Sequence, residues 1–187
     1  MKVSALGYAL LGLLARESLT GYELTGRMRE RIGFFWTARH SQIYPELARL
    51  EERGLVAHEP VEQEGKPDKK VYSITEAGRE ALAEWAAIPA DPGPTRDETT
   101  LKAYSLWAVD PAEAAALYRN EAVRHEERLA EYERIRDWMH EAWAEALRDP
   151  TTPEFASYAT LRRGLGYERE YAEWCRWVAG RLESAGG

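Results

Sequence analysis

Three prolines within six residues divide this chain of 187 residues into two segments. They lie in residues 89–94, PADPGP. Proline has no backbone N–H to donate within a helix and disfavours the helical conformation of the residue before it, so a helix cannot continue through this stretch. We therefore predict a linker at residues 89–96, an N-terminal domain at residues 1–88 and a C-terminal domain at residues 97–187.

The two segments differ in charge. Residues 1–80 contain 12 basic and 12 acidic side chains, whereas residues 81–187 contain 13 and 20 and carry the whole formal net charge of −7. Because phosphate repels an acidic surface, any contact with nucleic acid belongs to the N-terminal domain.

The first 53 residues predict three helices. Residues 3–15 are nearly all apolar, which indicates a helix buried on most of its surface. A second helix over residues 21–35 follows Thr20 as its N-cap, and a third over residues 41–53 has Ser41 as its N-cap and ends before Gly54. The apolar side chains at helical spacing in the second and third helices are Tyr22, Leu24, Met28, Ile32, Phe35, Ile43, Leu47 and Leu50.

A β-hairpin follows the third helix. Residues 55–60 and 70–75 alternate in polarity as strands do, and the polar, turn-rich residues 64–68 lie between them. Thr75 is placed to cap a further helix that runs to about Ile88.

The C-terminal domain is predicted to be all helical, with helices over about residues 97–108, 111–148 and 154–183. Apolar side chains in the two long helices keep steps of three and four, among them Tyr118, Leu129 and Met139 in one and Leu161, Cys175 and Val178 in the other. Nothing else in the sequence is left to cover these stripes, so we predict that a second copy of the chain does so in a homodimer.

The fold class is therefore mainly α: a winged helix-turn-helix, with a three-helix core and a β-hairpin wing, precedes an all-helical dimerisation domain. In such a fold the third helix enters the major groove of double-stranded DNA. The side chains predicted to contact an operator from this helix are Arg39, His40, Ser41, Gln42, Tyr44 and Arg49, and those from the wing are Lys66, Lys69 and Lys70.

Two segments closely resemble the DNA-binding domain of the PadR family of transcriptional regulators: SQIYPELARLEERGLV at residues 41–56 and EGKPDKKVYSITEAGREAL at residues 64–82. LGYALLGLLARESLTGYEL at residues 6–24 is similar to the start of those domains, and residues 159–174 resemble the C-terminal helix of members with a long helical dimerisation domain. The resemblance implies a homodimer on a palindromic operator and repression relieved by a small ligand.

Some of these residues also have simpler interpretations. Tyr72 lies inside an alternating strand and is expected in the core, whereas Tyr44 fits either the core or DNA. Arg27, Arg29 and Arg31 are either a solvated helix face balanced by Glu23 and Glu30 or phosphate contacts. The aromatic side chains predicted near the junction of the domains, where a small aromatic effector would bind, are Trp36, Trp85, Tyr104 and Trp107.

No catalytic or metal-binding motif is found, and the sequence predicts neither an enzyme nor a cofactor. The single cysteine, Cys175, fits a reducing cytoplasm, and no apolar run approaches the ~18 residues of a membrane span. Two alternatives stay open: a MarR-like regulator, and a helical dimerisation or scaffold protein whose winged domain binds protein.

Overall fold

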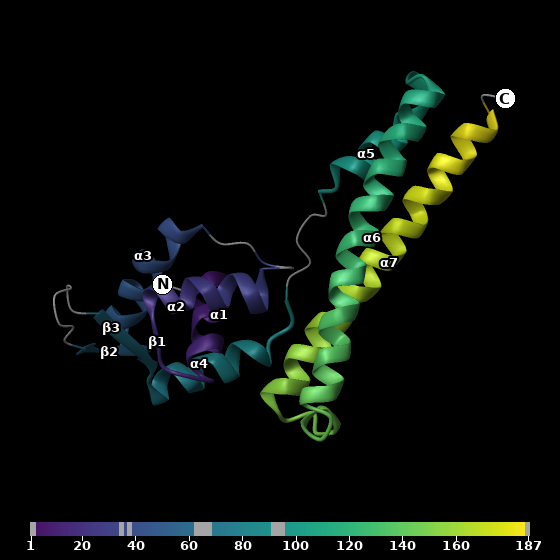
Figure 1. The fold of residues 1–187 in the computed structure, drawn as a ribbon. Helices are drawn as coiled ribbons and strands as arrows, with labels where there is room; N and C mark the ends of the chain where they lie inside the picture. Colours follow the sequence, from purple (N-terminus) through teal and green to yellow (C-terminus); the bar gives the residue numbers. More distant parts are fainter. Residues whose placement is uncertain (1–2, 34–35, 37–38, 62–68, 91–95, 186–187) are drawn as a thin grey trace. The chain divides into compact units, whose positions relative to one another are not determined.

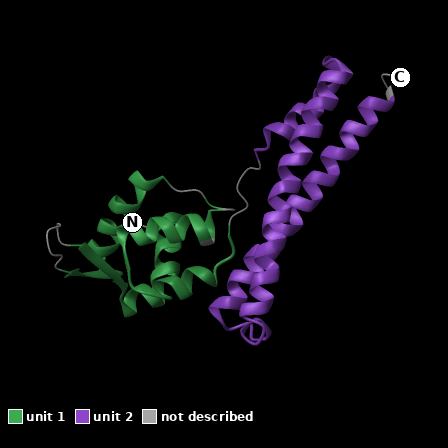
Figure 2. Cartoon of the chain, in the orientation of Figure 1, with its two compact units in different colours: residues 1–92 green, residues 93–187 purple. Residues whose placement is uncertain are grey.

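The computed structural model describes residues 3–33, 36, 39–61, 69–90 and 96–185. The chain forms two compact units, Met1–Pro92 and Gly93–Gly187 (Figure 2). Buried apolar side chains form a separate cluster in each unit, so each has a core of its own.

Unit 1 begins with two capped helices (Figure 1). α1 spans Ala5–Leu14, and the hydroxyl of Ser4 accepts the Gly7 N–H at its start. α2 spans Gly21–Arg27 and continues as a π-helix over Met28–Ile32. The prediction that Thr20 caps α2 is confirmed, and Glu23 completes a capping box by accepting the Thr20 N–H at 2.8 Å.

The predicted apolar face of α2 is wrong at Tyr22. Leu24 and Met28 are buried, but the side chain of Tyr22 is 78% exposed. Residues two apart lie about 200° from each other around a helix, so Tyr22 and Leu24 occupy opposite faces. Phe35 lies outside the described residues.

α3 spans His40–Glu52, one residue longer at its start than predicted. Ser41 is not the N-cap: Arg39 takes that position, and Gln42 caps it because its Oε1 accepts the Arg39 N–H at 2.9 Å. The inward face is as expected, with Ile43, Leu47 and Leu50 buried. The left-handed conformation expected of Gly54 after the helix is confirmed by its φ of 69°.

The predicted hairpin is confirmed, and a third short strand joins it. β2 spans Val56–Val61, β3 spans Lys69–Ile74, and the unpredicted β1 is Leu19–Thr20. The order is β1-β3-β2 with both pairs antiparallel, and Leu19 lies opposite Tyr72. Thr75 then caps α4, Glu76–Ala86, as predicted. The predicted turn at residues 64–68 lies outside the described residues.

The core of unit 1 lies between α1, α2, α3 and the sheet. Its largest fully buried side chains include Leu10, Leu11, Leu24, Leu47 and Leu50. This apolar core fixes the outer face of α3 and the strand β3 relative to each other, because both elements pack on it.

Unit 2 contains α5, Glu98–Tyr104, and two long helices, α6 over Pro111–Ala142 and α7 over Pro153–Ala185, with 3₁₀ turns at Leu106–Ala108 and Ala146–Arg148. The single helix predicted over residues 111–148 is therefore wrong at its end. Trp143 leaves the helical conformation, and its ring packs edge-on against Trp138. No helix among the described residues is long and apolar enough to cross a membrane.

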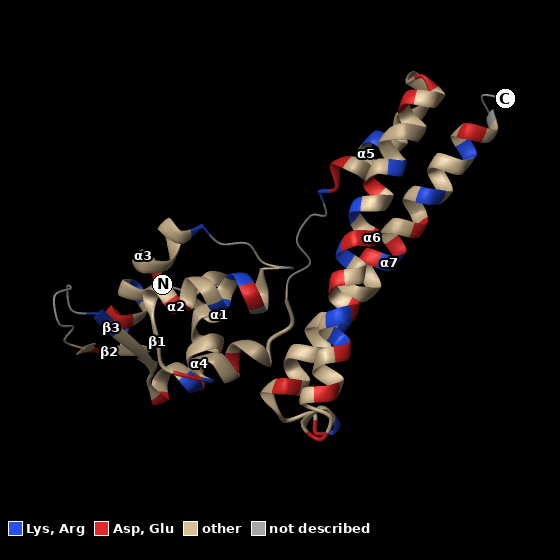
Figure 3. Ribbon diagram, viewed as in Figure 1, with Lys and Arg blue, Asp and Glu red and all other residues tan. Residues whose placement is uncertain are grey.

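The stripes of α6 and α7 cover each other within one chain. Tyr118 and Ala122 of α6 are buried against Cys175 and Val178 of α7. The reasoning that these stripes lack a partner was therefore wrong, because antiparallel neighbours in a helical hairpin bury both apolar faces. Lysine, arginine, aspartate and glutamate residues are distributed along both helices (Figure 3).

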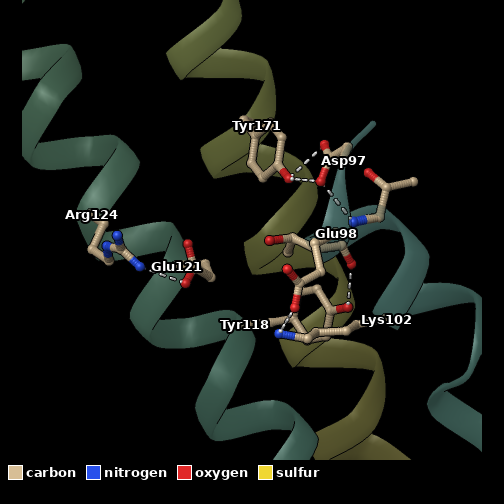
Figure 4. A network of polar contacts seen from close by, with 9 residues as sticks. Asp97, Glu98, Lys102, Tyr118, Glu121, Arg124 and Tyr171 are labelled. Carbon is tan, nitrogen blue, oxygen red and sulfur yellow. Dashed lines mark hydrogen bonds and ion pairs between the residues drawn. The ribbon is translucent and has the colours of Figure 1, made fainter. Parts of the chain in front are cut away.

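A polar network fastens the start of unit 2 to its helices (Figure 4). The Tyr171 hydroxyl donates to both carboxylate oxygens of Asp97 at 2.8 Å, and Asp97 also caps α5 by accepting the Thr100 N–H at 3.0 Å. The Tyr118 hydroxyl donates to the Thr99 carbonyl at 3.0 Å. The first residues after the linker are thus held by α6 and α7.

Candidate nucleic-acid interface

The N-terminal half of α3 exposes a group of hydrogen-bonding side chains. The members predicted from sequence, all exposed, are Arg39, His40, Ser41, Gln42 and Tyr44. The opposite face of α3 is buried, and these side chains lie outside the core, although the Tyr44 ring also packs against Gly21. Side chains of these types can read base edges or bind phosphate.

Glu46 holds α3 against α1. Its carboxylate is buried and accepts a hydrogen bond from the Ser4 hydroxyl at 2.6 Å. A Cβ on Gly7 would come within 2.7 Å of that carboxylate, so only glycine leaves room for it. Arg49, a predicted DNA contact, pairs with Glu46 at 2.8 Å but keeps 65% of its side chain exposed. Sequence reasoning missed Glu46 because a charged residue on a helix is by default solvated.

Tyr44 rests against the first residue of α2. A Cβ on Gly21 would lie 2.5 Å from the Tyr44 ring, which is closer than two such atoms can approach. Tyr44 also contacts His40, with ring centroids 5.3 Å apart, and remains 45% exposed. Of the two interpretations of Tyr44, the structure thus fits a partly packed side chain that still reaches solvent.

The wing places two lysines on the same concavity as Tyr44. Lys69 and Lys70 begin β3 and are exposed, whereas Tyr72 is buried as predicted. Burial raises the pKa of Tyr72. Lys66 lies outside the described residues.

An open concavity of about 690 Å³ joins α2, α3 and the wing. Tyr44, Lys69 and Lys70 line it together with Tyr22. Tyr22 is the residue that sequence reasoning missed here, although its angular position relative to Leu24 already placed it on the outer face.

The basic face of α2 is balanced by acidic neighbours. Arg27 pairs with Glu17 and with Glu30, each at 3.2 Å. The predicted partner Glu23 is instead engaged with Thr20, and these hydrogen bonds lower the pKa of its carboxyl group. Arg29 is exposed.

The four aromatic side chains predicted to bind an effector occur in both units. Trp36 borders an open concavity of about 560 Å³ beside the π-helix, with Met28 and Arg29 among the other lining residues. Trp85 stacks on Tyr8 with ring centroids 4.6 Å apart. In unit 2, Tyr104 and Trp107 are 83% and 88% exposed. Among the described residues no group of three His, Cys, Asp or Glu side chains is arranged to hold a metal ion.

In a comparison with known proteins, each unit matches a protein family. Residues 10–84 match the transcriptional regulator PadR-like family, and residues 95–183 match the virulence activator alpha C-terminal domain. The negative transcriptional regulator PadR of Bacillus subtilis is 33% identical over 95% of this chain and 97% of its own length. A probable transcriptional regulator of Mycobacterium tuberculosis is 34% identical over 96% of this chain and 98% of its own.

Solved structures have the same fold. The crystal structure of B. subtilis PadR in complex with operator DNA matches with a TM-score of 0.82 at 31% identity, covering 96% of this chain and 99% of that one. The complex of the same protein with p-coumaric acid matches with a TM-score of 0.78 at 30% identity over 95% of each chain. The Vibrio cholerae virulence activator AphA gives 0.74 at 28% identity, covering 97% and 99%.

The winged helix, the exposed face of α3 and the helical second unit together define a transcriptional regulator and not an enzyme. The chain belongs to the PadR-like family of these regulators. The protein is therefore a PadR-like regulator and not the MarR-like regulator that the sequence left open.

Proposed function

We propose that this protein is a repressor that binds a palindromic operator as a homodimer, with α3 in the major groove and the wing along the DNA backbone. The observation that carries the proposal is the division of α3 into two faces. Ile43, Leu47 and Leu50 are buried, while hydrogen-bonding side chains are exposed opposite them beside Lys69 and Lys70. The two lysines favour a polyanion such as DNA over the protein partner that a scaffold domain would bind.

The relatives support DNA binding and repression. The B. subtilis protein was crystallised with operator DNA and is named a negative regulator. AphA is named an activator, but it is less similar to this chain. Repression is therefore the direction of regulation that we propose, and the cytoplasm, where operator DNA is found, is the location.

Dimerisation through unit 2 is part of the proposal. Although α6 and α7 cover each other's main stripes, several large apolar side chains of this unit remain exposed: Leu101, Tyr104, Trp107, Val123 and Trp177. A second copy would bury them, and a two-fold dimer would present two recognition helices to half-sites about 34 Å apart.

We also propose a small, planar aromatic effector. The B. subtilis relative was crystallised with p-coumaric acid. In this chain Trp36, Trp85, Tyr104 and Trp107 are the aromatic side chains proposed to bind such a compound. A ligand that prefers the unbound form of the regulator lowers operator occupancy by its differential affinity for the two forms.

A gel-shift titration with the DNA upstream of the protein's own gene tests the main proposal. We expect a discrete complex that survives an excess of random-sequence competitor DNA. The matched variant Gln42→Ala should distinguish the same fragment less well from random-sequence DNA, because the exposed amide of Gln42 is missing. If no DNA fragment is shifted even at low salt, the result would instead support the alternative that the winged domain binds protein.

The effector is tested with p-coumaric acid as the probe. Quenching of tryptophan fluorescence at micromolar concentration should parallel the loss of the gel-shifted complex. Quenching without loss of DNA binding would overturn the regulatory role of the compound. The absence of both quenching and loss of DNA binding would exclude this compound as an effector.

A further inference from the structure

Tyr22 is an exposed aromatic side chain at the start of α2. Its side chain is 78% exposed, although it lies beside the folded core of unit 1. The neighbouring residues on both sides are fixed: Gly21 packs under the Tyr44 ring, and Glu23 is held in the capping box with Thr20. Tyr22 is therefore presented to solvent by a well-ordered turn of helix.

The surroundings of Tyr22 select for an anion. Tyr22 lines the same concavity as Tyr44, Tyr72, Lys69 and Lys70, so three tyrosines and two lysines border one open space. Glu23 also borders it, but its carboxylate accepts both the backbone N–H and the hydroxyl of Thr20, at 2.8 Å and 2.7 Å. Both bonds are accepted by Oε2 and hold the carboxylate in the capping box, and its single negative charge is outnumbered by the two lysines.

We propose that the Tyr22 hydroxyl donates a hydrogen bond to a phosphate oxygen of the DNA backbone, and that it thereby sets the depth at which α3 enters the groove. The inference rests on the proposed function. Tyrosine hydroxyls are common donors to DNA phosphate, and such contacts position a protein without reading sequence.

The position of Tyr22 distinguishes a backbone contact from a base contact. In a helix-turn-helix the helix before the recognition helix crosses the DNA backbone while the recognition helix reads the bases. Tyr22 belongs to the earlier helix and is grouped with the wing lysines, not with Ser41 and Gln42. Its contribution should accordingly be equal on every DNA sequence.

The test compares Tyr22→Phe with the wild-type full-length chain. The substitution removes one hydroxyl from a side chain that is largely in solvent, so folding is preserved and is checked by thermal melting. Tyr167→Phe, at an exposed tyrosine of α7 in unit 2, is the matched control. Affinities for the operator fragment and for a random fragment of equal length are measured over a range of salt concentrations.

We expect Tyr22→Phe to weaken both complexes by about 10-fold for each of the two hydroxyls that the homodimer loses, which is the effect of one charge-assisted hydrogen bond each. The dependence of affinity on salt should be unchanged, because a neutral phenol releases no counterion. Lys69→Ala, by contrast, should lower the salt slope by about one unit for each lost contact, which is about two units for the homodimer. Tyr167→Phe should leave both affinities at the wild-type value.

Three results would overturn the inference. Unchanged affinity of Tyr22→Phe would show that the hydroxyl makes no contact, and a loss confined to the operator would show a base contact instead. A loss of the same size in Tyr167→Phe would show that the effect is not local. If the wild-type chain binds no DNA, the proposed function fails, which is a different result from any of these.

Discussion

At the scale of single residues, Gly21 controls the position of Tyr44. We predict that Gly21→Ala lowers both the melting temperature and DNA affinity, because the added Cβ would lie 2.5 Å from the Tyr44 ring. Overpacking of this kind costs about 1–3 kcal/mol. The measurements are thermal melting followed by circular dichroism, and a gel shift.

Gly26→Ala is the matched control for Gly21→Ala. It lies in the same helix, and a Cβ there would meet nothing within 4 Å. Alanine should stabilise the helix by up to about 1 kcal/mol. Equal effects of the two substitutions would show that contact with Tyr44 is not the reason for glycine at position 21.

A second prediction separates reading of bases from binding of phosphate. Lys69→Ala and Lys70→Ala should weaken binding to all DNA sequences and reduce its salt dependence, whereas Gln42→Ala should relax the preference at one base pair by about 1–3 kcal/mol. The measurement is a set of gel shifts on operator fragments with single base changes.

Gln42→Ala also removes the acceptor for the Arg39 N–H, so its melting temperature must be compared with the wild type. Equal loss of affinity for operator and random DNA would contradict the recognition role of Gln42. Sequence could place Gln42 on the exposed face, but it assigned the cap of the helix to Ser41. Both side chains can satisfy free N–H groups, and only geometry decides between them.

At the scale of elements, the sequence predicted the capped helices and the hairpin because these depend on local signals. Thr20, Gly54 and Thr75 each act within one turn of their own position. The short strand β1 was missed because two residues carry no pattern, and its pairing with β3 is a tertiary contact. Likewise, nothing local indicated that α6 would end at Ala142, or that α7 would cover it.

The joint between α5 and α7 yields a prediction about pH. Burial raises the pKa of Asp97, but the hydrogen bonds from Thr100 and the Tyr171 hydroxyl outweigh it and hold this pKa below its ordinary value. A carboxyl group with a lowered pKa stabilises the fold above its unfolded pKa of ~4, and this stabilisation is lost as the pH falls through the folded value.

Asp97→Asn should therefore melt at a lower temperature than the wild type at pH 7, although asparagine keeps the cap. The difference should shrink as the pH falls from about 5 towards 3. In the background of Tyr171→Phe, the same substitution should have a smaller effect, because the shared hydrogen bond is already absent. A difference that is independent of pH would contradict the role of the Asp97 charge.

At the scale of the whole molecule, oligomeric state should follow unit 2. A fragment of residues 1–90 contains the complete core of unit 1 and is predicted to be a folded monomer by light scattering, whereas the full chain should be a dimer. Residues 96–187 should dimerise alone. A dimeric fragment of unit 1 would place the interface in the winged domain instead.

The prolines of residues 89–94 predict a division of the chain because they exclude a helix locally. The partner of each helix in unit 2 was not predictable. An amphipathic pattern indicates that one face of a helix is buried, but it does not indicate which element covers that face. Leu161 and Val178 would have shown the same spacing whether α6 or a second chain covered them. This is why the sequence indicated a dimer for a reason that the structure does not support.

The strand order of the wing also bears on solubility. β3 lies between β1 and β2, so β2 has an outer edge along which another strand could pair and begin aggregation. Pro60 lies within β2 and cannot donate a hydrogen bond, and Glu59 places a charge beside it. A ladder of intermolecular hydrogen bonds would be interrupted at this point. The hairpin can therefore stand out from the core of unit 1 without offering an uninterrupted template for amyloid-like assembly.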